Sequence, residues 1–199
     1  AVMSFQGRIA VITGGASGIG AACSRMLAER GAQVVVTDRD IARAEALAAE
    51  IGGTALALDV GSRAANDEAA AEIEARLGPV DILVTSAGVL QRPLRAEALS
   101  EADVEEVVRI DQIGTWNSAV AFGARMARRG RGSIITIASI AGMRSMPLHA
   151  YSPAKAAVIE VSRAIAGSRS GNRDAGKTER NIANGAASAK DRPSTTCTN

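Results

Sequence analysis

Aromatic residues are scarce in this sequence, with two Phe, one Trp and one Tyr among 199 residues. A hydrophobic core must therefore be mostly aliphatic, and a hydrophobic content of 47% suffices to build one. Cysteine is also rare, since only Cys23 and Cys197 are present, and such a pair predicts no disulfide framework. We expect no metal site.

The sequence has neither a strong excess of one charge nor a long apolar run. Its 23 basic and 21 acidic residues are interspersed and give a net charge of +2, which argues against nucleic-acid binding. The one basic cluster, residues 125–131, is interpreted as a helix C-terminus whose cations complement the helix dipole. No apolar run approaches about 18 residues and no signal peptide is recognisable, so we expect a soluble cytoplasmic protein without a membrane partner.

Short apolar runs alternate with longer segments of helical periodicity along the chain. This alternation predicts an α/β fold, namely a Rossmann-type doubly wound parallel sheet with helices on both faces. Such sheets bind ligands beyond the carboxyl ends of their strands. The expected strands are residues 8–13, 33–38, 54–58, 80–85 and 132–138, and the expected helices are residues 18–30, 40–51, 64–77, 101–129 and 151–166.

A glycine-rich turn follows the first expected strand. Glycines at such a turn let the backbone approach a pyrophosphate, which the N-terminus of the next helix stabilises. The spacing G-x-x-x-G-x-G differs from the commonest dinucleotide fingerprint, but the mechanics are the same. The cofactor-binding residues predicted in this turn are Gly14, Ser17, Gly18, Ile19 and Gly20.

Asp38 ends the second expected strand. A carboxylate at this position accepts hydrogen bonds from the hydroxyls of the adenine-linked ribose and repels a 2′-phosphate. We therefore expect NAD rather than NADP as the cofactor. Arg39 leaves an alternative open, because its guanidinium could pair with that phosphate or could simply be solvated at a strand end.

Tyr151 and Lys155 lie four residues apart, and Ser139 precedes them. On a helix this spacing places Tyr151 and Lys155 on one face. The ammonium then favours the phenolate, so the phenol can act as a general acid or base. The Ser139 hydroxyl can hold the substrate oxygen that gains or loses the proton. A tyrosine at the edge of the core beside a solvated lysine would show the same spacing, and the glycine-rich turn favours the catalytic interpretation.

Together, the glycine-rich turn and the set Ser139, Tyr151 and Lys155 resemble the short-chain dehydrogenase/reductase family, over residues of about 5–166. The resemblance implies hydride transfer between a nicotinamide cofactor and a small secondary alcohol or ketone. It implies that Tyr151 is the acid/base, Lys155 its partner and ribose anchor, and Ser139 the group that orients the carbonyl. A homodimer or homotetramer is also implied. The further cofactor contacts that it implies are Asp59, Val60, Ser86, Ala87 and Gly88.

The sequence departs from the family pattern at two site positions. Asp111 stands where the family has an asparagine that helps to hold a relay water near the lysine. An ionised Asp111 can accept from such a water or pair with Lys155, but it cannot donate. Ser86 replaces an asparagine beside the cofactor. These departures leave open a catalytically degenerate dinucleotide-binding or scaffold protein, whereas residues 121–126 faintly resemble polyol dehydrogenases and indicate a sugar alcohol as substrate.

The segment 167–199 contains one large aliphatic residue, Ile182, and no aromatic residue. We predict a nucleotide-binding domain over residues 1–166, which includes the catalytic residues, and a polar tail over residues 167–199. Such a tail buries too little apolar surface to offset its chain entropy. The last strands of a family-like sheet are therefore expected to be missing. Native disorder is one interpretation, and we favour the other, a shifted frame, truncated gene or misassigned sequence, because the change is abrupt.

Overall fold

A five-stranded parallel sheet forms the centre of the computed structural model, which describes residues 4–144 and 146–170. The strand order is β3-β2-β1-β4-β5, so the chain winds in one direction from β1 to β3 and in the other through β4 and β5. This doubly wound order confirms the predicted fold class. The strands are β1 (Ile9–Thr13), β2 (Gln33–Asp38), β3 (Thr54–Ala57), β4 (Ile82–Thr85) and β5 (Ser133–Thr136).

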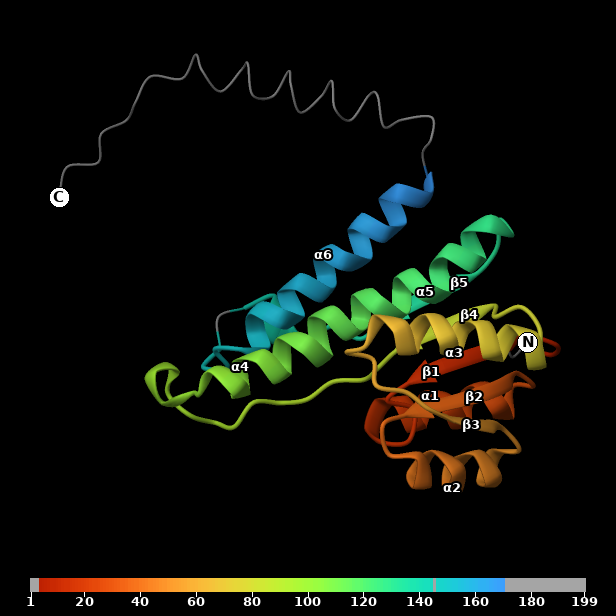
Figure 1. Cartoon of the computed structure of the whole chain (residues 1–199), viewed down its shortest axis with the longest axis horizontal. Helices are drawn as coiled ribbons and strands as arrows, with labels where there is room; N and C mark the ends of the chain where they lie inside the picture. Colours follow the sequence, from red (N-terminus) through yellow and green to blue (C-terminus); the bar gives the residue numbers. More distant parts are fainter. Residues whose placement is uncertain (1–3, 145, 171–199) are drawn as a thin grey trace, which may run out of the picture. The chain divides into compact units, whose positions relative to one another are not determined.

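Helices cover both faces of the sheet, as Figure 1 shows for α2 and α3 on opposite sides. Alternate residues of β1 point to opposite faces: Ile12 belongs to a core cluster with Leu27 and Leu47, whereas Val11 belongs to another with Ile73 and Phe122. Burial on both sides explains why β1 consists of apolar residues up to its last position. The helices are α1 (Gly18–Glu29), α2 (Ile41–Ile51), α3 (Arg63–Arg76), α4 (Glu101–Val107), α5 (Gly114–Arg128) and α6 (Tyr151–Ser170).

The helix predicted over residues 101–129 was wrong as a single element. A π-helical segment, η2 (Val108–Ile113), separates α4 from α5. Its wider turn changes the side-chain register between the two helices, and a hydrophobic periodicity does not reveal such a change. At the start of α5, Gly114 lies against Val60, where a Cβ would stand 2.5 Å from Cγ2. The π-helical segment carries Asp111 into the interior of the protein.

Other boundaries differ from prediction by a few residues. Buried apolar residues continue outside the paired strand, as at Val80 before β4, so four of the five predicted strands were too long, whereas the strand predicted over residues 33–38 matches β2. Two short 3-10 helices, η1 (Ala96–Ala98) and η3 (Ile140–Gly142), were not predicted. Among the described residues β5 pairs with β4 alone, so it forms the sheet edge, and Ile135 is 49% exposed.

The helix α6 continues to Ser170, beyond the predicted end at residue 166. The remainder of the predicted tail, residues 171–199, lies outside the described residues. The elements up to Arg163 belong to one compact unit, and the site described below lies within it. In the part of the chain that the structure describes, no helix is long and apolar enough to cross a membrane.

Candidate active site

A cavity of about 600 Å³ lies at the carboxyl ends of the parallel strands. That location is the one expected for a ligand in a doubly wound sheet. The turns after β1, β2, β3 and β4 line it, together with η2 and the first turn of α6. The predicted site residues that line this cavity are Gly14, Ser17, Gly18, Ile19, Asp38, Arg39, Asp59, Val60, Ser86, Ala87, Gly88, Asp111, Tyr151 and Lys155.

The glycine-rich turn is packed too tightly for a side chain at three positions, one of which is Gly15, whose Cβ would stand 2.8 Å from the Ile12 oxygen. A Cβ on Gly14, which has φ of +60°, would stand 2.6 Å from the Ala87 Cα, and a Cβ on Gly20 would stand 2.1 Å from the Gly14 oxygen. Gly20 thus shapes the turn, although it is not among the residues that line the cavity. Gly18 faces open space, because no described atom lies within 4 Å of its Cβ position.

The N-terminus of α1 borders the cavity. The helix starts at Gly18, and among the described residues the N-cap Ser17 makes no side-chain capping bond. Ser17, Gly18 and Ile19 all line the cavity, and Ile19 is 58% exposed. Open backbone donors at a helix N-terminus suit an anionic group such as a pyrophosphate. The turn therefore fits the phosphates of a dinucleotide.

Asp38 lies at the end of β2, and both of its carboxylate oxygens accept hydrogen bonds from backbone amides. Oδ2 accepts from Ala16 at 3.2 Å, and Oδ1 accepts from Asp40 at 3.1 Å. These bonds fix the carboxylate at the cavity wall while each oxygen keeps capacity to accept another hydrogen bond. Asp38 can therefore receive ribose hydroxyls without moving.

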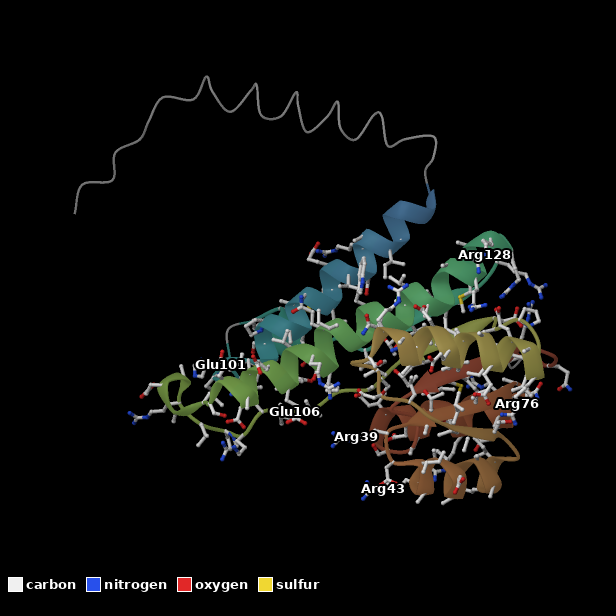
Figure 2. All side chains as sticks on the ribbon, in the orientation of Figure 1. Arg39, Arg43, Arg76, Glu101, Glu106 and Arg128 are labelled. Carbon is white, nitrogen blue, oxygen red and sulfur yellow. The ribbon has the colours of Figure 1, made fainter. Side chains whose placement is uncertain are left out.

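The two arginines at this end of the cavity, Arg39 and Arg43, each pair with a carboxylate. Arg39 lies 3.8 Å from Glu106 of α4, and Figure 2 shows these two side chains reaching toward one another from different elements. Arg43 lies 3.2 Å from Asp40. The charge on both guanidinium groups is thus partly balanced within the protein.

Asp59 follows β3 and forms a two-oxygen contact with Arg109 of η2, at 3.0 and 2.8 Å. Its Oδ1 also accepts from the Gly61 amide at 2.9 Å. Burial raises the pKa of the Asp59 carboxyl, but the bonds from Arg109 and Gly61 and the charges of Arg109 and Arg39 together outweigh burial and lower that pKa. Asp59 is therefore ionised at neutral pH.

Lys155 and Tyr151 lie on the first turns of α6 and line the cavity. The Lys155 Nζ stands 5.4 Å from the centroid of the Tyr151 ring and donates to the Ile137 carbonyl at 3.1 Å. Its side chain is only 5% exposed. The predicted spacing thus does bring the ammonium and the phenol together on one face of a helix.

Asp111 is fully buried and lies against Lys155, with Oδ1 2.9 Å from Nζ. The contact is an ion pair without hydrogen-bond geometry, and Oδ1 has no hydrogen-bond donor among the described residues. Oδ2 accepts from the Val89 amide at 2.9 Å. The sequence predicted that Asp111 either accepts from a relay water or pairs with Lys155, and the structure shows the pair with Lys155.

Ser139 is the N-cap of η3, where its Oγ accepts from the Ala141 amide at 3.1 Å. It is not among the residues that line the cavity. Ser139 belongs to the segment between β5 and α6, and its contact with a substrate remains a prediction. Ser86 lines the cavity, and its backbone amide donates to the Thr13 carbonyl at 3.1 Å.

Several cavity residues were missed by the prediction from sequence. Some are neighbours of predicted residues and could have been found by extending each motif along its loop. Gln91, which is not among the residues that line the cavity, was also missed, because it lies outside every sequence motif. Its side chain nevertheless accepts hydrogen bonds from the start of α6. The additional lining residues are Asp40, Arg43, Leu58, Val89, Leu90, Ile110 and Ile137.

A family model described as short chain dehydrogenase matches residues 8–170. The chain belongs to this family, which confirms the resemblance deduced from the motifs. It is 39% identical to D-threitol dehydrogenase of Mycolicibacterium smegmatis over 81% of this chain and 64% of that protein. It is 37% identical to galactitol 2-dehydrogenase of Rhizobium johnstonii over 82% of this chain and 69% of that protein. The chain thus spans about two thirds of the length of these relatives.

A solved structure from Brucella melitensis 16M superposes with a TM-score of 0.83 at 52% sequence identity. The match covers 85% of this chain and 66% of that one. That protein is named ribose-5-phosphate isomerase, whereas the relatives above are named dehydrogenases. The chemistry proposed for this chain must therefore follow from its own site residues.

Proposed function

We propose that the protein is a nicotinamide-dependent oxidoreductase that interconverts a secondary alcohol and a ketone. The observation that carries this proposal is the position of the Tyr151 and Lys155 pair, at 5.4 Å from Nζ to the ring centroid, in the same cavity as the glycine-rich turn. A dinucleotide cradle and a proton-transfer pair in one cavity suit this reaction. Family membership supports the same chemistry.

The residues of the cavity fit a dinucleotide. The glycine-rich turn and the N-terminus of α1 suit the pyrophosphate, and Asp38 suits the adenosine ribose. The family resemblance implies that Asp59 and Val60 would contact the adenine and that the segment 86–88 would contact the nicotinamide half, and all five residues line the cavity. When bound, the nicotinamide supplies the hydride acceptor for alcohol oxidation and the donor for ketone reduction.

NAD is the cofactor that we propose, rather than NADP. The carboxylate of Asp38, held by the Ala16 and Asp40 amides, would repel a 2′-phosphate. Arg39 could oppose this preference, but its contact with Glu106 reduces the positive charge that it offers to a phosphate. The paired Arg43 supports the same choice, because its guanidinium is already occupied by Asp40.

The chain's own residues move the substrate proton in this mechanism. During oxidation Tyr151 accepts the hydroxyl proton of the alcohol, and during reduction it returns that proton to the ketone oxygen. Lys155 stabilises the phenolate through its charge. Ser139 uses its hydroxyl hydrogen to hold the substrate oxygen, since its Oγ acts only as an acceptor toward Ala141. Asp111 balances the charge of Lys155.

A sugar alcohol is the substrate class that we propose. Relatives of this chain are named for threitol, galactitol and sorbitol. The segment 121–126, which resembles polyol dehydrogenases in sequence, does not carry this proposal, because Phe122 and Met126 are each 1% exposed in the core. Its resemblance reflects core packing rather than substrate contact.

Separate measurements of cofactor binding and turnover test the proposed function. The protein should bind NAD in a calorimetric titration, and reduced cofactor should accumulate with at least one of threitol, galactitol or sorbitol. The Tyr151→Phe variant serves as the matched control, since it removes one oxygen atom from the site. Binding of NAD without turnover across a panel of alcohols would support the degenerate or scaffold alternative instead.

We also propose that the protein forms a homodimer or homotetramer, as family resemblance implies. Ile113 and Trp116, at the junction of η2 and α5, are 40% and 43% exposed in the single chain. Trp116 is the only tryptophan, so its fluorescence reports on this surface alone. Sedimentation velocity should show a dimer or larger species, and dilution to monomer should shift the Trp116 emission to longer wavelength.

A further inference from the structure

Gln91 is a buried amide side chain that reaches from the loop after β4 to the start of α6. The residue is 5% exposed. Its Oε1 accepts two hydrogen bonds, from the Ala150 amide at 2.6 Å and from the Tyr151 amide at 3.0 Å. The donors lie 59 and 60 residues further along the chain. Gln91 therefore acts as an N-terminal cap that is supplied by a distant loop.

The two amides need this acceptor. The first amides of a helix have no partner within the helix itself. The next amide, of Ser152, donates to the Leu148 carbonyl at 2.8 Å, whereas those of Ala150 and Tyr151 donate to Gln91. Ala150 is 4% exposed, so water cannot easily replace the lost bond. Without Gln91 the start of α6 would have to move or leave buried donors unpaired.

The same loop holds the first turns of α6 at a second point. The Val89 amide donates to the Asp111 Oδ2, and the Asp111 Oδ1 contacts the Lys155 Nζ. The loop thus connects to Lys155 through Asp111 and to the Tyr151 backbone through Gln91. The preceding residues of this loop, Ser86, Ala87 and Gly88, line the cavity where the cofactor is proposed to bind.

We propose that Gln91 is a positioning residue, which fixes the Tyr151 phenol relative to the cofactor loop by capping α6. The catalytic consequence rests on the proposed function, but the capping itself does not. Removal of the cap lets Tyr151 shift while Lys155 stays tied to Asp111 and Ile137, so the pair loses its alignment. A small misplacement of a reacting group is enough to slow catalysis strongly.

Three variants of the full chain separate positioning from general loss of stability. Gln91→Met removes the acceptor at nearly constant volume. Gln91→Glu keeps an oxygen that accepts both amides, so it should keep the start of α6 capped, although it exchanges the Nε2 donor to the Arg92 carbonyl for a buried charge that lowers overall stability. Gln33→Met makes the same chemical change at an exposed position at the start of β2 and serves as the matched control.

Hydrogen exchange and fluorine NMR measure the cap without any turnover. In the native protein and in Gln91→Glu the Ala150 and Tyr151 amides should be protected, and in Gln91→Met they should exchange at least about fivefold faster. Tyr151 is the only tyrosine, so fluorotyrosine labelling gives one signal, which should shift or broaden in Gln91→Met alone. Unprotected amides in the native protein would overturn the proposal, whether or not Gln91→Met folds.

Kinetics then test the catalytic consequence. In Gln91→Met the kcat for an alcohol should fall at least about tenfold, while the Kd for NAD changes less than about threefold. In Gln91→Glu and Gln33→Met the fluorotyrosine signal should keep the chemical shift and line width of the native protein. A faster amide exchange with unchanged kcat would show that Gln91 only stabilises the helix and would overturn the positioning role. Absence of turnover in every protein, with the exchange result as expected, would contradict the proposed function and leave the cap established.

Discussion

The Asp111 carboxylate and the Lys155 ammonium form an ion pair in the interior of the protein, with Oδ1 2.9 Å from Nζ and neither side chain more than 5% exposed. A pair of this kind offers little net stability compared with apolar residues of equal size, but loss of one partner leaves an isolated buried charge. Because Lys155 also faces the Tyr151 ring, the charge that Asp111 supplies affects the proposed proton-transfer pair directly.

Substitution of Asp111 by asparagine should lower the stability of the protein. Asp111→Asn leaves Lys155 with the Ile137 carbonyl but without a counter-charge, so we expect a loss of about 3 kcal/mol in unfolding free energy, measured by urea denaturation. The control Asp67→Asn breaks an exposed pair with Arg63 and should cost at most about 0.5 kcal/mol. Equal losses of unfolding free energy in Asp111→Asn and Asp67→Asn would contradict the presence of an unpaired buried charge at Lys155.

The same variant should retain or raise turnover per folded molecule. A neutral amide at position 111 restores the donor and acceptor found in the family and no longer neutralises Lys155. Because Asp111→Asn is expected to be less stable than the native protein, initial rates should be divided by the folded fraction at the temperature of the assay. A large loss of normalised turnover would show that the Asp111 carboxylate itself takes part in proton transfer.

Removal of the Tyr151 hydroxyl should abolish turnover but spare the cofactor. Tyr151→Phe is expected to lower kcat by at least about a hundredfold, because it removes the proposed general acid and base. Affinity for NAD should change by less than about threefold. Lys155→Met should weaken both functions and also destabilise the fold, since it leaves Asp111 buried without its cation.

Cofactor selectivity should depend on Asp38 and on the partner of Arg39. We expect NAD to bind at least about tenfold more tightly than NADP, and Asp38→Ala should narrow that gap. Glu106→Gln frees Arg39 to meet a 2′-phosphate and should strengthen NADP binding by up to about fivefold, the range of an exposed ion pair. Glu105→Gln, at an exposed position on the same helix, is the matched control and should leave the ratio of NAD to NADP affinity unchanged.

The contact between Asp59 and Arg109 should make a small, pH-dependent contribution to stability. The pKa of Asp59 is lowered in the folded protein, so its contribution is fully present above the unfolded carboxyl pKa of about 3.9 and is lost as the pH falls through the folded pKa. Arg109→Gln should therefore lower stability at neutral pH by at most about 1 kcal/mol, since the pair is half exposed.

Denaturation of the Arg109→Gln protein at several pH values checks this prediction. The difference from the native protein should shrink as the pH falls below about 4. Arg128→Gln removes the same charge from an exposed position on α5 and should show no such dependence. A difference that persists unchanged at acid pH would mean that Arg109 stabilises the fold through packing rather than through Asp59.

Local sequence patterns predicted the fold class and much of the lining of the cavity. The apolar runs Ile9–Ile12 of β1 and Val34–Val36 of β2 are buried on both faces, and such short runs between helical segments indicate a parallel sheet. Gly20 follows from local backbone clearance, since a Cβ there would stand 2.1 Å from the Gly14 oxygen. The four-residue spacing of Tyr151 and Lys155 follows from helix geometry. These features depend only on residues close together in the chain.

Relations between distant segments were decided by the tertiary structure alone. The sequence offered two partners for Asp111, and only the π-helical turn of η2 against α6 selects Lys155. Likewise, the pairing of Arg39 with Glu106 and the capping of Tyr151 by Gln91 join residues sixty or more positions apart. Periodicity and spacing record the neighbours of a residue along the chain, whereas these contacts arise because parallel strands bring the ends of separate segments to one edge of the sheet.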